Sequence, residues 1–261
     1  MLKKCLLACV VIACILGLSA ISAKADIIAE PVVYEIEGQP YEGYFALNKG
    51  FGDQQPLVLL IHDWDGIDAY EQRRVQMLAE RGYAAFAADL YGQGVRPTTT
   101  EASREESGKL YSDRDTMRQR LFAGLAQAQS MAGVDSERAV AIGYCFGGAA
   151  ALEFARAGAD IDGFVSFHGG LETPDGQDYS EVAGPLLVLH GSDDPVAPMT
   201  QVAALADELN MAEVDYDMEI YGGARHAFTV WTADRESSRY DAEADIQSWD
   251  ALLRFLDKSF S

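Results

Sequence analysis

The sequence is short of basic residues. Only 20 Lys and Arg stand against 41 Asp and Glu, so the formal net charge is −21. The longest basic clusters are the pairs Lys3-Lys4 and Arg73-Arg74. The chain therefore lacks the phosphate-binding patch that supplies most of the affinity of nucleic-acid-binding proteins. We exclude nucleic acid as a partner and interpret the acidic excess as a soluble, self-repelling surface.

Repeats and low-complexity segments are also absent. The 24 Gly and 8 Pro follow no fixed period, and no Pro- or Ser-rich linker divides the chain. Hydrophobic residues make up 49% of the 261 residues, which is enough for a sizeable core. This composition excludes a disordered or collagen-like protein, and the lack of a linker favours one domain.

The first 25 residues have the features of a secretory signal. A lysine pair precedes an uncharged stretch, Cys5–Ala23, and an Ala-Lys-Ala sequence ends at Ala25. We predict cleavage after Ala25 and export to the periplasm or the exterior, with no stable membrane association afterwards. Two alternatives stay open: an uncleaved membrane anchor, because the apolar run is nearly long enough to span a bilayer, and lipidation of Cys14, because residues 11–14 resemble a lipobox.

Cysteine becomes scarce once this segment is removed. Cys5, Cys9 and Cys14 leave with it, and only Cys145 remains. Cysteines of exported proteins usually pair, and this one has no cysteine to pair with. Such a thiol is either buried and inert or has a chemical role.

Strands alternate with helices along residues 26–261. Two alternating runs, residues 32–36 and 42–47, predict an antiparallel hairpin. The further strands that we expect are 57–61, 83–88, 139–142, 163–167, 186–189 and 215–220, and the expected helices are 69–81, 101–131 (as one or two), 147–157, 200–210 and 242–255. This order predicts a single α/β domain with a mostly parallel sheet flanked by helices, whose site lies at the carboxyl ends of the strands.

One strand end carries a pattern typical of a nucleophile elbow. Residues 143–148 read Gly-Tyr-Cys-Phe-Gly-Gly between a predicted buried strand and an Ala-rich helix. The glycines allow the sharp strand-to-helix turn that holds the nucleophile in a strained conformation. The start of the helix also directs its positive end at a thiolate. The pattern therefore favours Cys145 as a nucleophile over a small buried hydrophobe.

A base and an acid follow in the order that α/β-hydrolases use, which is nucleophile, acid, histidine. His226 is the only histidine after the acid candidates and lies in a Gly-rich loop beyond a predicted strand. Asp194, in the sequence Gly-Ser-Asp-Asp-Pro after another strand, is the expected acid, and Asp193 is the alternative. We predict that Cys145, His226 and Asp194 form a catalytic triad.

The remaining polar residues at strand ends favour structural roles. We expect His62, His168 and His190 to be satisfied structural histidines. No group of His, Cys and carboxylates has convincing metal-ligand spacing, so we expect no metal and no cofactor. The acidic segment 234–245 reads as a solvated face before the last helix.

Taken together, the motifs resemble the dienelactone hydrolase family. The resemblance covers nearly all of residues 26–261 and rests on segments 59–66, 81–92, 143–148, 191–198 and 223–228. It implies an α/β-hydrolase fold and a small ester or lactone substrate. It further implies that Cys145 attacks the carbonyl to form a thioester, which water hydrolyses with His226 as base. The implied oxyanion hole consists of the backbone N–H groups of Phe146 and Trp64.

Two positions differ from the family pattern. Members typically carry a thiol-activating Glu where this sequence has Asp63, which is one methylene shorter. The family's dienelactone enzymes hold the substrate carboxylate with arginines, and none of the four residues after His226 is Arg. We therefore expect a substrate other than dienelactone itself, and we count Arg104, Arg225 and Tyr144 as candidate substrate contacts.

Two other classes of function stay in view. A catalytically silent α/β-hydrolase scaffold that binds a ligand or protein is the main alternative, and a Cys145 side chain turned away from His226 would favour it. A thiol redox protein is the third, but it would be expected to carry a resolving cysteine, and residues 26–261 contain only one cysteine. The oligomeric state does not follow from the sequence.

Overall fold

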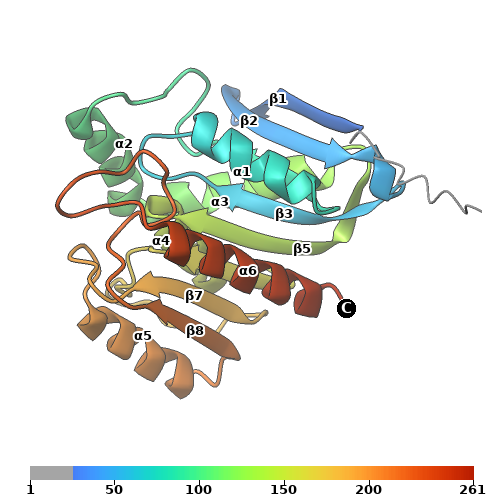
Figure 1. Cartoon of the computed structure of the whole chain (residues 1–261). Coiled ribbons are helices and arrows are strands. Elements are labelled where there is room, and N and C mark those ends of the chain that lie inside the picture. Colours follow the sequence, from blue (N-terminus) through green and yellow to red (C-terminus); the bar gives the residue numbers. More distant parts are fainter. Residues whose placement is uncertain (1–25) are drawn as a thin grey trace, which may run out of the picture.

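The computed structural model describes residues 26–261, and the predicted signal segment lies outside them. The described chain folds around an eight-stranded sheet with the order β1-β2-β4-β3-β5-β6-β7-β8 (Figure 1). The strands are β1 (Ile27–Ile36), β2 (Gln39–Asn48), β3 (Gln55–Ile61), β4 (Ala84–Ala88), β5 (Val134–Tyr144), β6 (Gly163–Phe167), β7 (Leu186–Gly191) and β8 (Tyr216–Tyr221). The pairs β1–β2 and β2–β4 are antiparallel and all other pairs are parallel, which confirms the predicted sheet and its opening hairpin.

Helices cover both faces of this sheet (Figure 1). They are α1 (Ala69–Ala79), α2 (Thr100–Ser112), α3 (Arg114–Gln129), α4 (Phe146–Arg156), α5 (Met199–Met211) and α6 (Ala242–Ser259), with a short 3₁₀ turn η1 (Lys49–Phe51). Apolar side chains of α1 and α6 pack on one face, and those of α2 to α5 pack on the other. Among residues 26–261, no helix is both long and apolar enough to cross a membrane.

The central strands are buried on both faces. In β3, Leu57, Leu59 and Ile61 join the core under α3 and α4, while Val58 and Leu60 join the core under α1 and α6. Each of these side chains is fully buried, and such burial contributes about 1.5–3 kcal/mol per side chain. This two-sided packing explains the continuous apolar run in the sequence and fixes where the strand ends lie.

The structure decides one element boundary that the sequence left open and moves another. The region 101–131, expected as one or two helices, is two helices, because the Asp113 side chain accepts the N–H of Thr116 and so caps the start of α3. Strand β5 begins at Val134, before the expected 139, and its pairing with β3 shifts register between Pro56 and Leu57. Neither the cap nor the bulge changes the hydrophobic pattern from which the elements were predicted.

The acidic segment 234–245 is mostly exposed, as expected, but its last residue, Asp245 in α6, departs from the expectation of a solvated face. Asp245 is buried and forms an ion pair with the almost fully buried guanidinium of Arg74 in α1. That guanidinium also lies over the rings of Tyr70, Trp231 and Trp249. The pair therefore attaches α6 to α1, and the removal of one partner would leave a buried charge uncompensated.

Candidate active site

Cys145 occupies a strained turn between β5 and α4. Its backbone has φ 54° and ψ −111°, a region that L-amino acids rarely adopt. The neighbouring glycines are required by close approach, because a Cβ on Gly143 would lie 1.9 Å from the Gly147 carbonyl oxygen and one on Gly147 would lie 2.1 Å from that of Ile61. The glycines predicted from the elbow pattern are therefore needed for steric reasons.

His226 contacts both the thiol and a carboxylate. Its Nε2 lies 3.0 Å from Cys145 Sγ, and its Nδ1 lies 2.8 Å from Asp194 Oδ2. Asp194 is held in turn by the backbone N–H groups of Val196 and Ala197, which donate to its Oδ1. Asp193 instead accepts the hydroxyl of Ser192. The structure thus brings the three predicted residues together and places Asp194, not Asp193, against the imidazole.

The electrostatics of this group favour a charged imidazole. Burial alone would lower the pKa of His226, but the charge of Cys145 and the hydrogen bonds to Asp194 and Cys145 raise it to about 10. Burial would raise the pKa of Asp194, but the hydrogen bond and charge of His226 lower it. The arrangement therefore supports an imidazolium at His226 that is hydrogen-bonded to an ionised Asp194.

A second carboxylate group lies beside the sulfur. Asp63 follows β3 and lines the same pocket as Cys145. Burial raises its pKa well above the ordinary value, and the charges of Glu71 and Cys145 add to this effect. Glu71 is itself fully buried, and its Oε1 accepts the backbone N–H of Asp63. Burial and repulsion thus favour the neutral form of Asp63 more than in an exposed aspartate.

The pocket at the strand ends has a volume of about 560 Å³. Cys145, His226 and Asp63 lie on its floor and walls, together with Trp64 and Arg104. A loop that sequence reasoning missed closes one side, and its pocket-lining residues are Val230, Thr232, Ala233, Asp234, Arg235, Ser237 and Ser238. No periodicity marks this loop in the sequence, so only its folded path reveals the contribution.

Arg235 on this loop lines the pocket, which the sequence did not reveal. Its Nη1 donates to the hydroxyl of Thr100 at 3.2 Å, and its guanidinium lies 5.9 Å from the centre of a Trp64 ring. With Arg104 it gives the pocket two guanidinium groups, opposed by Asp65 and Asp234 on the lining. The pocket can therefore take a polar substrate beside its apolar walls.

Two of the predicted substrate contacts lie elsewhere, which corrects the expectation for both. Arg225 lines a separate shallow hollow with Asp193 and Pro195 and donates to the carbonyl of Glu236. Tyr144 is fully buried and stacks on Phe167 inside the core. Of the three residues, only Arg104 reaches the pocket. Tyr144 does not, because it precedes the nucleophile on the strand and its side chain points back into the core.

The three other histidines are buried and bind backbone groups. His62 Nε2 accepts the N–H of Leu90, and its Nδ1 contacts the Asp63 carbonyl at 2.6 Å. His190 Nε2 contacts the Ala197 carbonyl at 2.7 Å. Burial lowers the pKa of both rings, so they stay neutral. Each ring thereby fixes a loop that carries a site residue.

His168 connects the nucleophile to the loop that carries His226. Its Nδ1 accepts the backbone N–H of Cys145 at 3.2 Å, which leaves Nε2 to donate to the Thr229 hydroxyl at 2.8 Å. Thr229 in turn contacts the hydroxyl of Tyr70 at 2.6 Å. Burial, together with the charge of His226, lowers the pKa of His168 well below its usual range. A neutral ring therefore holds both sides of the Cys145–His226 contact.

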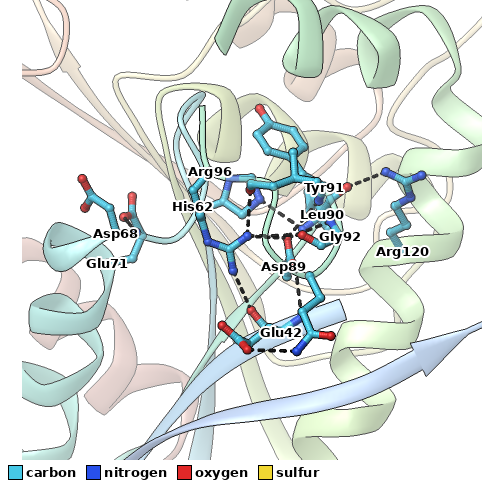
Figure 2. Close-up of polar contacts among 12 residues, drawn as sticks. Glu42, His62, Asp68, Glu71, Asp89, Leu90, Tyr91, Gly92, Arg96 and Arg120 are labelled. Carbon is cyan, nitrogen blue, oxygen red and sulfur yellow. Dashed lines mark hydrogen bonds and ion pairs between the residues drawn. The ribbon is translucent and has the colours of Figure 1, made fainter. Parts of the chain in front are cut away.

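A buried aspartate supports the loop below Trp64. Figure 2 shows Asp89 at the centre of this group, where it accepts the backbone N–H groups of Glu42, Tyr91 and Gly92. Arg96 lies 3.5 Å from the same carboxylate. These contacts hold the loop after β4, whose Leu90 binds His62. Asp89 is thus structural support for the site and does not face its pocket.

Two backbone donors face the site without protein partners. Phe146 is the first residue of α4, where helical N–H groups have no acceptor within the helix. Within residues 26–261, neither the N–H of Phe146 nor that of Trp64 donates a hydrogen bond to the protein. They come from the elbow and from the loop after β3, and Trp64 lines the same pocket as Cys145. Both groups are therefore available to a ligand at the thiol.

The fold and the site define an α/β-hydrolase. The solved structure titled m3DLH superposes with a TM-score of 0.85 at 32% identity, covering 90% of this chain and 99% of that one. A dienelactone hydrolase-like promiscuous phosphotriesterase from metagenomic libraries superposes with a TM-score of 0.83 at 31% identity, covering 89% and 98%. Both are similar along almost their full lengths.

The family follows from the sequence match. The model of the dienelactone hydrolase family matches residues 41–260, and the chain belongs to this family. A protein of Synechocystis sp. that is provisionally named carboxymethylenebutenolidase is 28% identical over 226 residues, 79% of this chain and 87% of that protein. The chain is therefore a hydrolase of lactones or esters, as the resemblance implied.

Proposed function

We propose that the protein hydrolyses small carboxylic esters or lactones through a thioester on Cys145. The observation that carries this proposal is the single imidazole that contacts Sγ at 3.0 Å and Asp194 at 2.8 Å. In this mechanism the thiolate attacks the carbonyl carbon, and the alcohol leaves with a proton from His226. Water then attacks the thioester and gives its proton to His226, which restores the thiolate–imidazolium pair. Asp194 orients the imidazole throughout.

The oxyanion formed in both steps is stabilised by backbone donors. The N–H groups of Phe146 and Trp64 have no protein acceptor within residues 26–261, so a substrate oxygen meets no competitor. The start of α4 adds its positive end at the same place. One such donor is worth about 10²–10³ in turnover in other hydrolases.

In this proposal Asp63 limits the ionisation of the Cys145 thiol. It lies in the pocket with Cys145, and the two groups repel each other when both are charged. Repulsion by Asp63 lowers the ionised fraction of the Cys145 thiol, which slows its oxidation in an oxidising compartment. A substrate that displaces the Asp63 carboxylate raises the ionised fraction again. Comparison of iodoacetamide labelling of the wild type and Asp63→Ala across pH tests this role. Faster labelling of the variant near neutrality supports it, and equal rates contradict it.

The main experiment is a panel of esters and lactones on purified residues 26–261. Turnover with a panel member is expected, and mass spectrometry of the acid-quenched enzyme should show an acyl adduct on the peptide that contains Cys145. An aryl phosphotriester is included because one related structure is named as a phosphotriesterase. Ester turnover that survives Cys145→Ala contradicts the mechanism. The absence of turnover with every ester and lactone, with folding intact, would instead support the silent-scaffold alternative.

We also propose that the protein is exported and that residues 26–261 form its single domain. The support is the charge and hydropathy pattern of the first 25 residues together with the family match that begins at residue 41. The intact mass of the exported protein is expected to correspond to cleavage after Ala25. A mass that retains the segment, or a diacylglyceryl adduct on Cys14, contradicts the proposal. One cooperative thermal transition is expected for the single domain.

A further inference from the structure

One carboxylate close to the site is completely buried and has no cation beside it. Glu71, in the first turn of α1, is 0% exposed. Arg74, one turn later, pairs with Asp245, so Glu71 has no basic partner within residues 26–261. Glutamate is almost never fully buried unless it is paired. The mechanism above assigns no role to this residue.

Two backbone N–H groups hold the Glu71 carboxylate. Its Oε1 accepts the N–H of Asp63 at 3.3 Å, and its Oε2 accepts that of Asp68 at 3.0 Å. Figure 2 shows Glu71 next to Asp68, the residue that caps α1. Asp63 and Asp68 lie near the two ends of the loop between β3 and α1, which also carries Trp64. Glu71 therefore fixes the loop whose Asp63 lines the pocket with Cys145.

The same contacts favour different protonation states for the two carboxyl groups. N–H donors on both oxygens favour the charged form of Glu71. Asp63 accepts the N–H of Asp65 on Oδ1 at 3.1 Å, whereas its Oδ2 accepts no N–H group within the described chain. Two neighbouring buried carboxyl groups without a cation are not both ionised readily, because like charges repel. The geometry therefore places the charge on Glu71 and a proton on Asp63.

The charges around Asp63 agree with this distribution. Burial raises the pKa of Asp63 well above its usual range, and the charge of Glu71 is the next largest influence, followed by a side-chain hydrogen bond to Asp65. Burial and the charge of Asp68 also raise the pKa of Glu71, against its backbone hydrogen bonds. Both shifts mean that the pair carries fewer than two charges near neutrality. The other titratable or charged groups on the pocket side of Asp63 are Tyr91, Arg104, Cys145, His226, Asp234 and Arg235.

We infer that Glu71 is a positioning residue for the nucleophile: as a buried anion it keeps Asp63 protonated, which allows the Cys145 thiol to ionise. A negative Asp63 opposes a thiolate in the same pocket, whereas a neutral Asp63 does not. Glu71 does not line the pocket, so its effect reaches the sulfur through Asp63. The benefit to ester hydrolysis rests on the proposed function, whereas the place of the proton does not.

Three substitutions of nearly constant shape separate this role from its alternatives. Glu71→Gln removes the buried charge, and Asp63→Asn removes the group that holds the proton. Asp68→Asn is the matched control, because it removes an exposed charge of the same capping box and Asn caps a helix as well as Asp does. Thermal transitions of the three variants check their folding.

The place of the proton is measured by infrared spectroscopy, through the carbonyl stretch of a protonated carboxyl group. At pH 6.5, where ordinary carboxyl groups are ionised, the wild type should show this band and Asp63→Asn should lose it. Glu71→Gln should weaken the band, and Asp68→Asn should retain it. A band that is absent from the wild type, or that persists in Asp63→Asn, overturns the inference. The wild type and Asp63→Asn decide this point even if Glu71→Gln does not fold.

Ionisation of the thiol is measured by the rate of iodoacetamide labelling of Cys145 at pH 7, which does not depend on ester turnover. Glu71→Gln should slow labelling by about three- to tenfold, because Asp63 then ionises and opposes the thiolate. In the Asp63→Asn background the same substitution should change the rate by less than about twofold. Asp68→Asn should also change it by less than about twofold.

The alternatives predict other results. A direct effect of the Glu71 charge on the sulfur predicts faster labelling of Glu71→Gln, because a negative charge would be removed. A purely structural role predicts equal slowing with Asp63 and with Asn at position 63. Either result overturns the inference.

The kinetic arm uses any ester that the panel identifies as a substrate. Glu71→Gln should raise the acidic midpoint of kcat/KM by about 0.5–1 pH unit, and Asp68→Asn should leave it in place. An unchanged midpoint in Glu71→Gln overturns the link to hydrolysis. If no ester reacts, the proposed function fails, and the infrared and labelling results still decide whether Glu71 keeps the proton on Asp63.

Discussion

The four histidines of the chain lie in two regions, and the pKa of the imidazole is shifted in opposite directions in the two. His62, His168 and His190 form a buried layer at the ends of the parallel strands, and the pKa of each is lowered. His226 lies above them in the pocket, and its pKa is raised to about 10. All four are at most 7% exposed, so burial alone does not distinguish them.

The difference lies in the hydrogen-bond partners. The buried layer binds backbone N–H and carbonyl groups and the hydroxyl of Thr229, which carry no net charge. His226 binds a carboxylate on one nitrogen and a thiol on the other. Neutral partners leave the desolvation of the charged ring uncompensated, whereas anionic partners more than offset it. A histidine becomes a base here through its partners and not through its place at a strand end.

The strongest test of this comparison removes the thiol. Cys145→Ala should lower ester turnover by about 10⁴-fold or more, because the nucleophile is lost. The same change should lower the pKa of His226 from about 10, since the charge of Cys145 is the largest influence that raises it. Titration of the imidazole by NMR measures this shift. A pKa that stays near 10 would mean that Asp194 alone sustains the charged ring.

The next largest effect is expected from the acid. Asp194→Asn should lower turnover by about 10³- to 10⁴-fold, because the imidazole loses the carboxylate that fixes its orientation and charge. Asp193→Asn should change turnover less than about fivefold, since Asp193 contacts Ser192 and not the ring. Steady-state kinetics of the two variants measure the contrast. A crippling Asp193→Asn with a mild Asp194→Asn would reverse the assignment.

A smaller effect is expected in the buried layer. His168→Leu removes the donor to Thr229 and one of two acceptors of the Cys145 N–H, the other being the Phe167 carbonyl at 3.0 Å. It should lower kcat by about 10- to 100-fold with little change in KM. His168→Gln, which retains an acceptor and a donor, should recover part of this loss. Because the ring is neutral, neither variant should move the pH midpoints of kcat/KM. A shifted midpoint would place His168 among the titrating groups.

The smallest effect concerns stability and Asp63. Its pKa is raised in the fold, so folding is penalised once the pH exceeds the unfolded pKa near 3.9, and the penalty grows until the pH passes the folded value. Asp63→Asn should therefore raise Tm by about 2–4 °C at pH 8 and have almost no effect at pH 4. Calorimetric melts across this range measure the difference. An equal shift at both pH values would mean a packing effect instead.

The sequence was sufficient to predict a site residue wherever the position of that residue along a strand determined its place in the fold. Parallel strands end at one edge of the sheet, so Cys145, Asp194 and His226 could be predicted to meet before any contact was known. The elbow glycines carried the same information, because any side chain at Gly143 would bring its Cβ to 1.9 Å from the Gly147 carbonyl oxygen. These inferences depend on local backbone geometry, which the pattern encodes.

The sequence was insufficient where a loop path decided the outcome. Arg235 reaches the pocket and Arg225 does not, although both follow β8 and neither lies in a periodic segment. Asp245 looked like part of an exposed acidic run because its partner, Arg74, is 171 residues away in the chain. Tyr144 is adjacent to the nucleophile, yet strand alternation turns it into the core. Long-range pairing and loop paths leave no local signal.

The backbone strain at Cys145 has a consequence for laboratory evolution. A positive φ of 54° with ψ −111° costs a non-glycine residue about 1–3 kcal/mol, and glycine avoids most of that cost. A library selected only for heat resistance would therefore be expected to accumulate Cys145→Gly, which gains stability by discarding the chemistry. Continued selection for hydrolysis keeps the cysteine side chain at this position. A screen for thermostable variants of this protein therefore has to assay activity as well, so that Cys145 is retained.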